Sequence, residues 1–346
     1  MFRFAHSMKE KGNRTAQIRN LLGNARHIAI TMHDSPDGDA VGSALGLWAY
    51  LEKKGYDAQV ISPNEYPAYY HWISGHKEVL FHNKEPELCE ARMAAADLVF
   101  CLDFNTPGRL CGLEDALLAS GAPKIMIDHH PHPADLFDVS LADPTSSSTA
   151  GLVYEFILGL GDSDLIGRDV AEALYTGLLT DTGCFRYSST DARTLQTAAA
   201  LIDCGVDHEA VCSAVYDNNS EHRLRLTGYC LSEKMQVLDE YKTVLIALSA
   251  EELNRFHYKT GDTEDLVNYG LTIAGMRMSA LITERSDEIK VSLRSKGDFA
   301  VNRIAREHFN GGGHKHAAGG QTLLTLDETV EKLLSLLPRY KEELNA

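Results

Sequence analysis

The chain has 346 residues, a length typical of two domains, and an ordinary globular composition with 44% hydrophobic and 24% charged residues. Its 49 acidic and 33 basic residues give a net charge of −16, which argues against long nucleic-acid duplexes as partners, because such binding draws on a broad basic surface. The seven cysteines include no close CxxC pair, and no stretch resembles a signal core or a membrane span, so we expect a cytoplasmic protein with reduced thiols and no membrane partner.

Strand-like and helix-like patterns alternate over the first two thirds of the chain. The expected strands cover residues 27–32, 58–62, 98–102 and 124–127. The expected helices cover residues 14–23, 40–54, 112–119, 147–159, 168–180, 191–204 and 207–216. This alternation predicts an α/β domain over residues 1–217, in which helices cover both faces of a parallel sheet.

The pattern changes after a polar, helix-like stretch at residues 218–234, which we interpret as a helical linker. Beyond it, strand-like segments are expected at residues 235–240, 243–249, 274–284 and 288–294, with helices near 262–271, 298–309 and 326–345. Consecutive strands followed by helices predict a smaller, mixed α/β domain over residues 235–346.

Acidic and imidazole side chains recur where the predicted elements of the first domain end. The segment His33-Asp34-Ser35-Pro36-Asp37-Gly38-Asp39 follows one strand, Asp103 follows another, Asp128-His129-His130 follows a third, and Asp181 ends a helix. Sites in open α/β sheets form at the carboxyl ends of strands. A solvated turn explains one such segment alone, but repetition at this position indicates a shared site.

Six of these side chains have the donor atoms of a metal site: His33, Asp37, Asp39, Asp103, His129 and Asp181. Imidazole nitrogen and carboxylate oxygen suit Mn(II), Mg(II), Fe(II) or Zn(II). Four carboxylates with two neutral imidazoles carry a charge of about −4, which two divalent cations balance. One carboxylate bridging two ions about 3.5–4 Å apart is the usual design of two-metal phosphoesterases, so the site is predicted to hydrolyse a phosphate ester.

Five segments resemble, in order, the motifs of the DHH phosphoesterase superfamily. They are HDSPDGDAVGS (33–43), Leu102-Asp103, Asp128-His129-His130, LLTDTG (178–183) and GGGHKHAAGG (311–320), of which the last resembles the signature of the DHH-associated domain. The resemblance spans most of the chain. It implies two divalent ions, with Mn(II) favoured and Mg(II) as the alternative.

The resemblance also implies a role for each matching residue. The ligands would form two groups joined by a bridging Asp103: His33 and Asp37 on one side, and Asp39, His129 and Asp181 on the other. His130 would face the substrate phosphate or the attacking water, and Asp128 would orient the histidines from behind, as metal-bound imidazoles generally require.

In the second domain, Gly311, Gly312 and Gly313 lack a Cβ and can admit a phosphate close to the backbone, although a flexible turn is the alternative. Arg294 ends a predicted strand, and a guanidinium suits bidentate contact with phosphate. The resemblance implies that Arg294 and His314 grip the substrate. Arg109, just past Asp103, is a weaker candidate, because a surface arginine explains it as well.

The chain resembles the nanoRNase and pAp-phosphatase members of this superfamily. That resemblance implies hydrolysis of RNAs of roughly two to five nucleotides to mononucleotides, removal of the 3′-phosphate of pAp, and a homodimer. Three alternatives stay open: a phosphodiesterase for linear dinucleotides such as pApA or pGpG, a RecJ-like single-strand exonuclease, and a nucleotide-binding regulator without catalysis.

Overall fold

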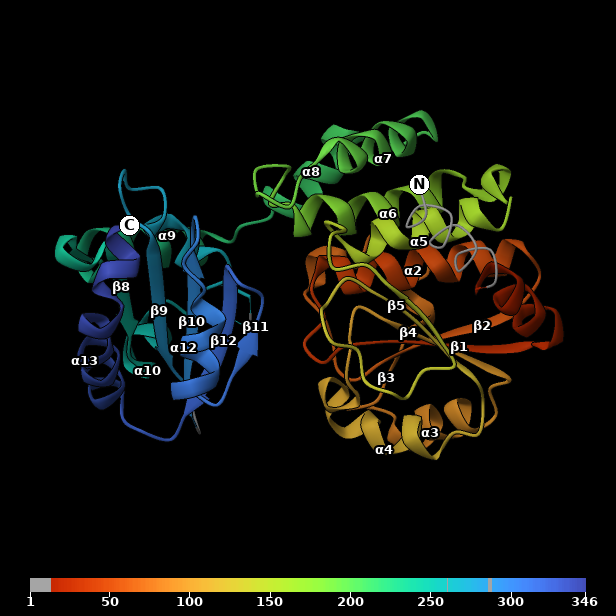
Figure 1. Ribbon diagram of the computed structural model, residues 1–346, viewed down its shortest axis with the longest axis horizontal. Coiled ribbons are helices and arrows are strands. Elements are labelled where there is room, and N and C mark those ends of the chain that lie inside the picture. The colour runs from red at the N-terminus through yellow and green to blue at the C-terminus, as the bar shows by residue number, and fades with distance from the viewer. Residues whose placement is uncertain (1–13, 260, 286–287) are drawn as a thin grey trace, which may run out of the picture. The chain divides into compact units, whose positions relative to one another are not determined.

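A computed structural model describes residues 14–259, 261–285 and 288–346, and the chain divides into two units, residues 1–218 and 219–346 (Figure 1). The first unit contains a six-stranded, wholly parallel sheet in the order β3-β2-β1-β4-β5-β6. Its strands are β1 (His27–Met32), β2 (Asp57–Ser62), β3 (Leu80–Phe81), β4 (Leu98–Leu102), β5 (Lys124–Asp128) and β6 (Val139–Ala142). The strand order reverses between β1 and β4, and such a switch point is where ligands bind in open α/β sheets.

Helices cover both faces of this sheet, as the sequence predicts (Figure 1). One face packs against α2 (Gly38–Lys53), α5 (Thr149–Gly159) and α6 (Arg168–Asp181). The other packs against α3 (Pro86–Ala94) and α4 (Glu114–Ala119). Along β1, Ile28 and Ile30 enter the first core and Ala29 enters the second, which explains why apolar residues follow one another here without a polar residue at every second position.

Shorter elements complete the first unit. Residues 14–24 are helical, and α7 (Ala192–Asp203) and α8 (His208–Tyr216) pack against α6. The 3-10 helices are η1 (Ala68–Tyr70), η2 (His76–Glu78), η3 (Pro107–Leu113) and η4 (Ser163–Leu165). Besides short 3-10 helices, α3, β3 and β6 were not expected from the sequence, because β3 and β6 are short edge strands and α3 is mostly exposed.

The second unit is a mixed α/β structure around a six-stranded sheet in the order β11-β12-β10-β9-β8-β7. In this sheet β8 and β9 pair in parallel, and the other neighbouring strands pair antiparallel over their described residues. Its strands are β7 (Gln236–Leu238), β8 (Thr243–Leu248), β9 (Met278–Glu284), β10 (Ile289–Ser295), β11 (Gly312–Gly313) and β12 (Ala317–Thr322). Its helices are α9 (Glu221–Tyr229), α10 (Ala250–Arg255), α11 (Leu266–Gly270), α12 (Val301–His308) and α13 (Leu326–Asn345), with a π-helix η5 (Cys230–Lys234) and a 3-10 helix η6 (Asp239–Tyr241). The predicted fold class of both parts is confirmed.

Within the expected linker, residues 218–234, residues 221–234 form α9 and η5, and Leu226 and Cys230 are buried beside Ile246 and Leu248 of β8. Residue 218 belongs to the first unit and residues 219–234 to the second. In that unit, α10, β11 and β12 were not expected from the sequence. The segment Ala317–Thr322 carries two glycines and no large apolar side chain, so it lacks the pattern of a strand. Among the helices of the described ranges, none is both long enough and apolar enough to traverse a bilayer.

Candidate metal centre

The acidic and imidazole side chains of the first unit meet at the carboxyl edge of the parallel sheet. His33 follows β1, Asp103 follows β4, and Asp128 ends β5, and these three strands are neighbours in the sheet. Met32 pairs with Leu102, and Leu102 pairs with Ile127, so the three strands end side by side. The topology therefore brings together residues that are separated by up to about a hundred positions in the chain.

Two helix ends supply the remaining side chains. Asp37 is the N-cap of α2, where its Oδ1 accepts hydrogen bonds from the backbone N–H groups of Asp39 and Ala40 at 3.0 and 3.1 Å. Asp39 lies in the first turn of α2, which favours a carboxylate at the positive end of the helix dipole. Asp181 is the last residue of α6, where the dipole disfavours a negative charge.

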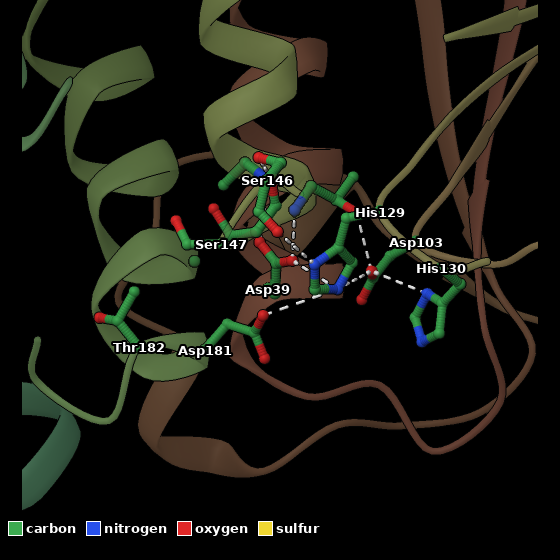
Figure 2. A network of polar contacts seen from close by, with 12 residues as sticks. Asp39, Asp103, His129, His130, Ser146, Ser147, Asp181 and Thr182 are labelled. Atoms are coloured by element: carbon green, nitrogen blue, oxygen red, sulfur yellow. Dashed lines mark hydrogen bonds and ion pairs between the residues drawn. The ribbon is translucent and has the colours of Figure 1, made fainter. Parts of the chain in front are cut away.

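Asp103 lies between two histidines, with one oxygen toward each. Its Oδ2 lies 3.4 Å from His33 Nε2, and its Oδ1 lies 3.6 Å from His129 Nε2. His33 Nε2 also lies 3.8 Å from Asp37 Oδ1, while His129 Nε2 lies 3.6 Å from Asp181 Oδ2. Figure 2 shows Asp103 and Asp181 around the His129 ring. The six predicted ligands thus form two groups that share Asp103, and His129 Nε2 lies 4.0 Å from Asp39 Oδ2.

Each group has the donor chemistry and spacing to hold a divalent ion. Separations of 3.4 to 4.0 Å exceed the hydrogen-bond range of about 2.7–3.2 Å. They are close to the spacing expected of two ligand atoms that each lie about 2.0–2.2 Å from one ion. Neutral imidazole and carboxylate are ligands of Mn, Fe and Zn, and neither group includes a thiolate among the residues that the structure describes.

Burial and mutual repulsion shift the pKa values of these carboxylates apart. Burial, together with the charges of neighbouring carboxylates, raises the pKa of Asp39 well above its ordinary value and that of Asp181 to about 7. Burial acts the same way on Asp103, but the nearby imidazoles of His33, His129 and His130 together outweigh it and lower the Asp103 pKa. Burial would lower the pKa of His33, yet Asp103 and Asp37 raise it to about 10. The centre therefore needs positive charge, supplied by protons or by cations.

The N-terminus of α5 supports this arrangement through contacts that the sequence did not reveal. The backbone N–H groups of Thr149 and Ala150 donate to Asp39 at 2.6 and 2.9 Å, and Thr149 Oγ1 donates to Asp103 Oδ1 at 2.8 Å. Ser148 is the N-cap, so the polar run before α5 does serve helix capping. The run of hydroxyl residues at 145–149 was the available signal; it favours a helix cap, with a phosphate site as the alternative.

His130 is held between Asp128 and Arg109. Its Nδ1 lies 2.7 Å from Asp128 Oδ1, and its Nε2 lies 2.8 Å from Arg109 Nη1. Because a carboxylate only accepts and a guanidinium only donates, these contacts assign the proton to Nδ1 and leave Nε2 to accept from Arg109. Asp128 is fully buried, so it fixes the ring from within the protein. Arg109 thus reaches the candidate metal centre through its hydrogen bond to His130.

In the second unit, the predicted binding residues lie at one end of the sheet. Arg294 lies in β10, and Gly312 and Gly313 form β11. A Cβ on Gly313 would lie 2.5 Å from the Ala317 carbonyl, and a Cβ on Gly311 would lie 1.9 Å from the Gly319 carbonyl, whereas one on Gly312 would meet nothing within 4 Å. Two of the three glycines are therefore required by the close approach of β12. His314 follows β11, and its backbone N–H donates to the Ala317 carbonyl at 2.8 Å.

Comparison with known proteins identifies both parts of the chain. Residues 27–178 match the model of the DHH family, N-terminal domain, and residues 242–343 match that of the DHHA1 domain. A protein from Bacteroides fragilis, described as exopolyphosphatase-related, has a solved structure that is 38% identical, with a TM-score of 0.94 over 97% of this chain and 98% of that one.

Curated relatives match over most of the chain as well. The bifunctional oligoribonuclease and PAP phosphatase NrnA of Thermus thermophilus is 29% identical over 92% of this chain and 90% of its own length. The Bacillus subtilis protein of the same name is 27% identical over 91% of this chain and 95% of its own length. The cyclic-di-AMP phosphodiesterase PdeA of Listeria monocytogenes is 25% identical over 93% of this chain and 49% of its own length. The chain therefore belongs to the DHH phosphoesterase family and carries a DHHA1 domain.

Proposed function

We propose that this protein is a metal-dependent phosphoesterase that hydrolyses short oligoribonucleotides to mononucleotides and removes the 3′-phosphate of pAp. The observation that carries the proposal is Asp103, whose two oxygens face His33 and His129 and so join two groups of ligand atoms. The two NrnA relatives, which match this chain over nine tenths of its length, support the choice of substrates.

The six proposed ligands divide as the two groups do. His33 and Asp37 would hold one ion, Asp39, His129 and Asp181 would hold the other, and Asp103 would bridge them. Divalent ions at these positions would acidify a water molecule and neutralise the charge of a phosphate. Mn(II) suits the mixed imidazole and carboxylate donors and is the proposed ion, with Mg(II) as the alternative.

The remaining residues orient the reactants. Asp128 holds the His130 ring in one tautomer, and Arg109, bonded to the other ring nitrogen, brings a permanent positive charge toward the phosphate. Arg294, His314 and Gly312 are proposed to bind the substrate from the second unit, with Gly311 and Gly313 shaping the loop around them. The cytoplasmic location, the homodimer and the preference against long duplexes stay predictions from the sequence.

A phosphodiesterase for linear dinucleotides is the second candidate, favoured by the likeness to the cyclic-di-AMP phosphodiesterase of Listeria. This chain spans about half of that relative's length.

The test compares turnover of a diribonucleotide, a five-nucleotide RNA, pAp, pApA and pGpG in Mn(II). We expect mononucleotides from both RNAs and AMP from pAp. Hydrolysis of pApA and pGpG alone would establish the second candidate. Absence of turnover on all five substrates, with protein shown to be folded and loaded with metal, would contradict both.

A further inference from the structure

The turn that follows Asp181, one of the proposed metal ligands, carries an exposed aromatic ring. Asp181 ends α6, and Tyr187 lies six residues later with 42% of its surface exposed. Gly183, which Tyr187 contacts, is two residues from Asp181, so its Cα lies within about 8 Å of the Asp181 Cα. An amphipathic aromatic ring exposed this near in sequence to a proposed metal ligand can contact a bound substrate.

One face of the Tyr187 ring packs against Gly183. A Cβ built on Gly183 would lie 2.3 Å from Tyr187 Cζ and 2.6 Å from both Cε atoms. These three ring atoms are nearer than the hydroxyl oxygen, so the position is covered by the ring face and not by its edge. Gly183 is therefore required here, both for its φ of +55° and because any side chain would displace the ring.

The turn holds this arrangement at an energetic cost. After Gly183, Cys184 and Phe185 also have positive φ values of 59° and 62°, a conformation that non-glycine residues adopt rarely. Phe185 packs edge-on against Tyr175 in the core, which anchors the turn from below. Such strained backbone persists only where surrounding contacts enforce it.

Thr182 provides those contacts. It is buried, its carbonyl accepts the N–H groups of both Arg186 and Tyr187 at 3.0 Å, and its hydroxyl accepts the N–H of Phe185 at 3.1 Å. Arg186 is exposed in the same turn, and its Nε donates to the Gly183 carbonyl at 2.9 Å. A rigid aromatic face beside a cation is the combination with which proteins bind single-stranded nucleic acids independently of sequence.

We propose that Tyr187 is a stacking platform for the base of the nucleotide whose phosphate is bound at the metal centre. This inference rests on the proposed function and extends it from the phosphate to the base. Stacking uses the π-face that every base has, so the platform would accept any base and would contribute to affinity more than to the chemical step.

The test uses Tyr187→Ala, Tyr187→Phe and Tyr187→Trp in the full chain, with Tyr269→Ala as control. Tyr269 lies in α11 and has a similar exposure of 45%. With a diribonucleotide, we expect Tyr187→Ala to raise KM by about 5- to 100-fold and to change kcat by less than about threefold. Tyr187→Phe and Tyr187→Trp should preserve KM. For a substrate with the same phosphodiester backbone but no bases, KM should be the same for all the variants.

A binding measurement separates this inference from the proposed function. A dinucleotide that carries 2-aminopurine should lose fluorescence on binding to the wild type and to Tyr187→Trp, and should bind Tyr187→Ala more weakly, whether or not it is cleaved. If the wild type cleaves the diribonucleotide but Tyr187→Ala has an unchanged KM, or if KM rises equally on the substrate without bases, the platform is wrong and the proposed function stands. If nothing is cleaved while the fluorescence change depends on Tyr187, the proposed function is wrong and the stacking platform stands.

Discussion

The two sheets of this protein carry their polar residues in different places. In the parallel sheet, His33, Asp103 and Asp128 come at or directly after the last residue of a strand, at one edge. In the mixed sheet, Arg294 lies within β10, and His314 follows a strand of only two residues. Strand ends of a parallel sheet converge whatever the side chains are, whereas positions along antiparallel strands depend on register.

This difference suggests that the two sheets have different tasks, which are metal binding and substrate binding, and that mutations can affect one task without the other. The parallel sheet gathers acids and imidazoles, which bind cations. In the mixed sheet, β10 carries Arg294, and an arginine side chain binds anions. The following variants should therefore divide into those that affect metal loading or catalysis and those that affect substrate affinity.

The largest effect is expected for Asp103→Asn. It removes the charge shared by the two groups while keeping the shape of the side chain, so kcat/KM should fall by more than about 100-fold, the upper range for residues that only support metal ligands. Metal content should fall too, as measured on the purified protein. Asp57→Asn is the matched control, because Asp57 pairs with His27 at the opposite end of the sheet with 60% of its side chain exposed. Near-normal turnover of Asp103→Asn in saturating Mn(II) would remove the two-metal proposal.

Asp128→Asn should have the next largest effect. The amide cannot hold the His130 ring as the carboxylate does, so kcat should fall by about 10- to 100-fold with metal content preserved. Steady-state kinetics and metal analysis on the same preparation check this. Loss of metal in parallel with activity would show instead that Asp128 supports the ligands and not His130.

Arg294→Ala and His314→Ala should change affinity and not metal loading. Loss of a charged contact to phosphate is expected to raise KM by about tenfold for each residue. Arg303→Ala, which breaks an ion pair with Glu343 on the same unit, is the control for loss of a surface arginine. A fall in metal content with an unchanged KM would mean that these two residues support metal binding and not substrate binding.

The smallest effect concerns stability of the second unit. Burial would raise the pKa of Glu252, but hydrogen bonds from Lys234, Tyr229 and the Ser249 backbone outweigh it and lower the pKa to about 2. Because the folded pKa lies below the unfolded one, this carboxylate stabilises the fold above about pH 4.5, and the stabilisation declines as the pH falls toward 2. Its side chain is 19% exposed, so we expect about 2 kcal/mol after allowing for solvent screening.

Urea unfolding of Glu252→Gln and of the wild type between pH 7 and 3 measures this contribution. The difference in free energy of unfolding should be greatest at pH 7 and should shrink below pH 4.5. A difference that is constant with pH would mean that the carboxylate charge is not what stabilises the second unit.

The sequence predicted most of the parallel domain because its signals are local. An apolar run such as β4, buried on both faces, and an amphipathic segment such as α6 are each visible in a short window. The edge strands β3 and β6 and the glycine-containing β12 lack that signal, since their pairing is enforced by neighbouring strands and not by their own residues. The burial of Leu226 in α9 was equally hidden, because it depends on β8 and α10.

For the site, the sequence by itself determined which side chains reach the carboxyl edge, because parallel strands must end together there. Only the tertiary structure decided how they are paired. That Asp103 faces two histidines, that Thr149 donates to it across 46 residues, that Arg109 meets His130 and that Tyr187 covers Gly183 all depend on how distant segments pack. Backbone periodicity carries no information on such contacts, because they follow from side-chain rotamers and from close packing between elements.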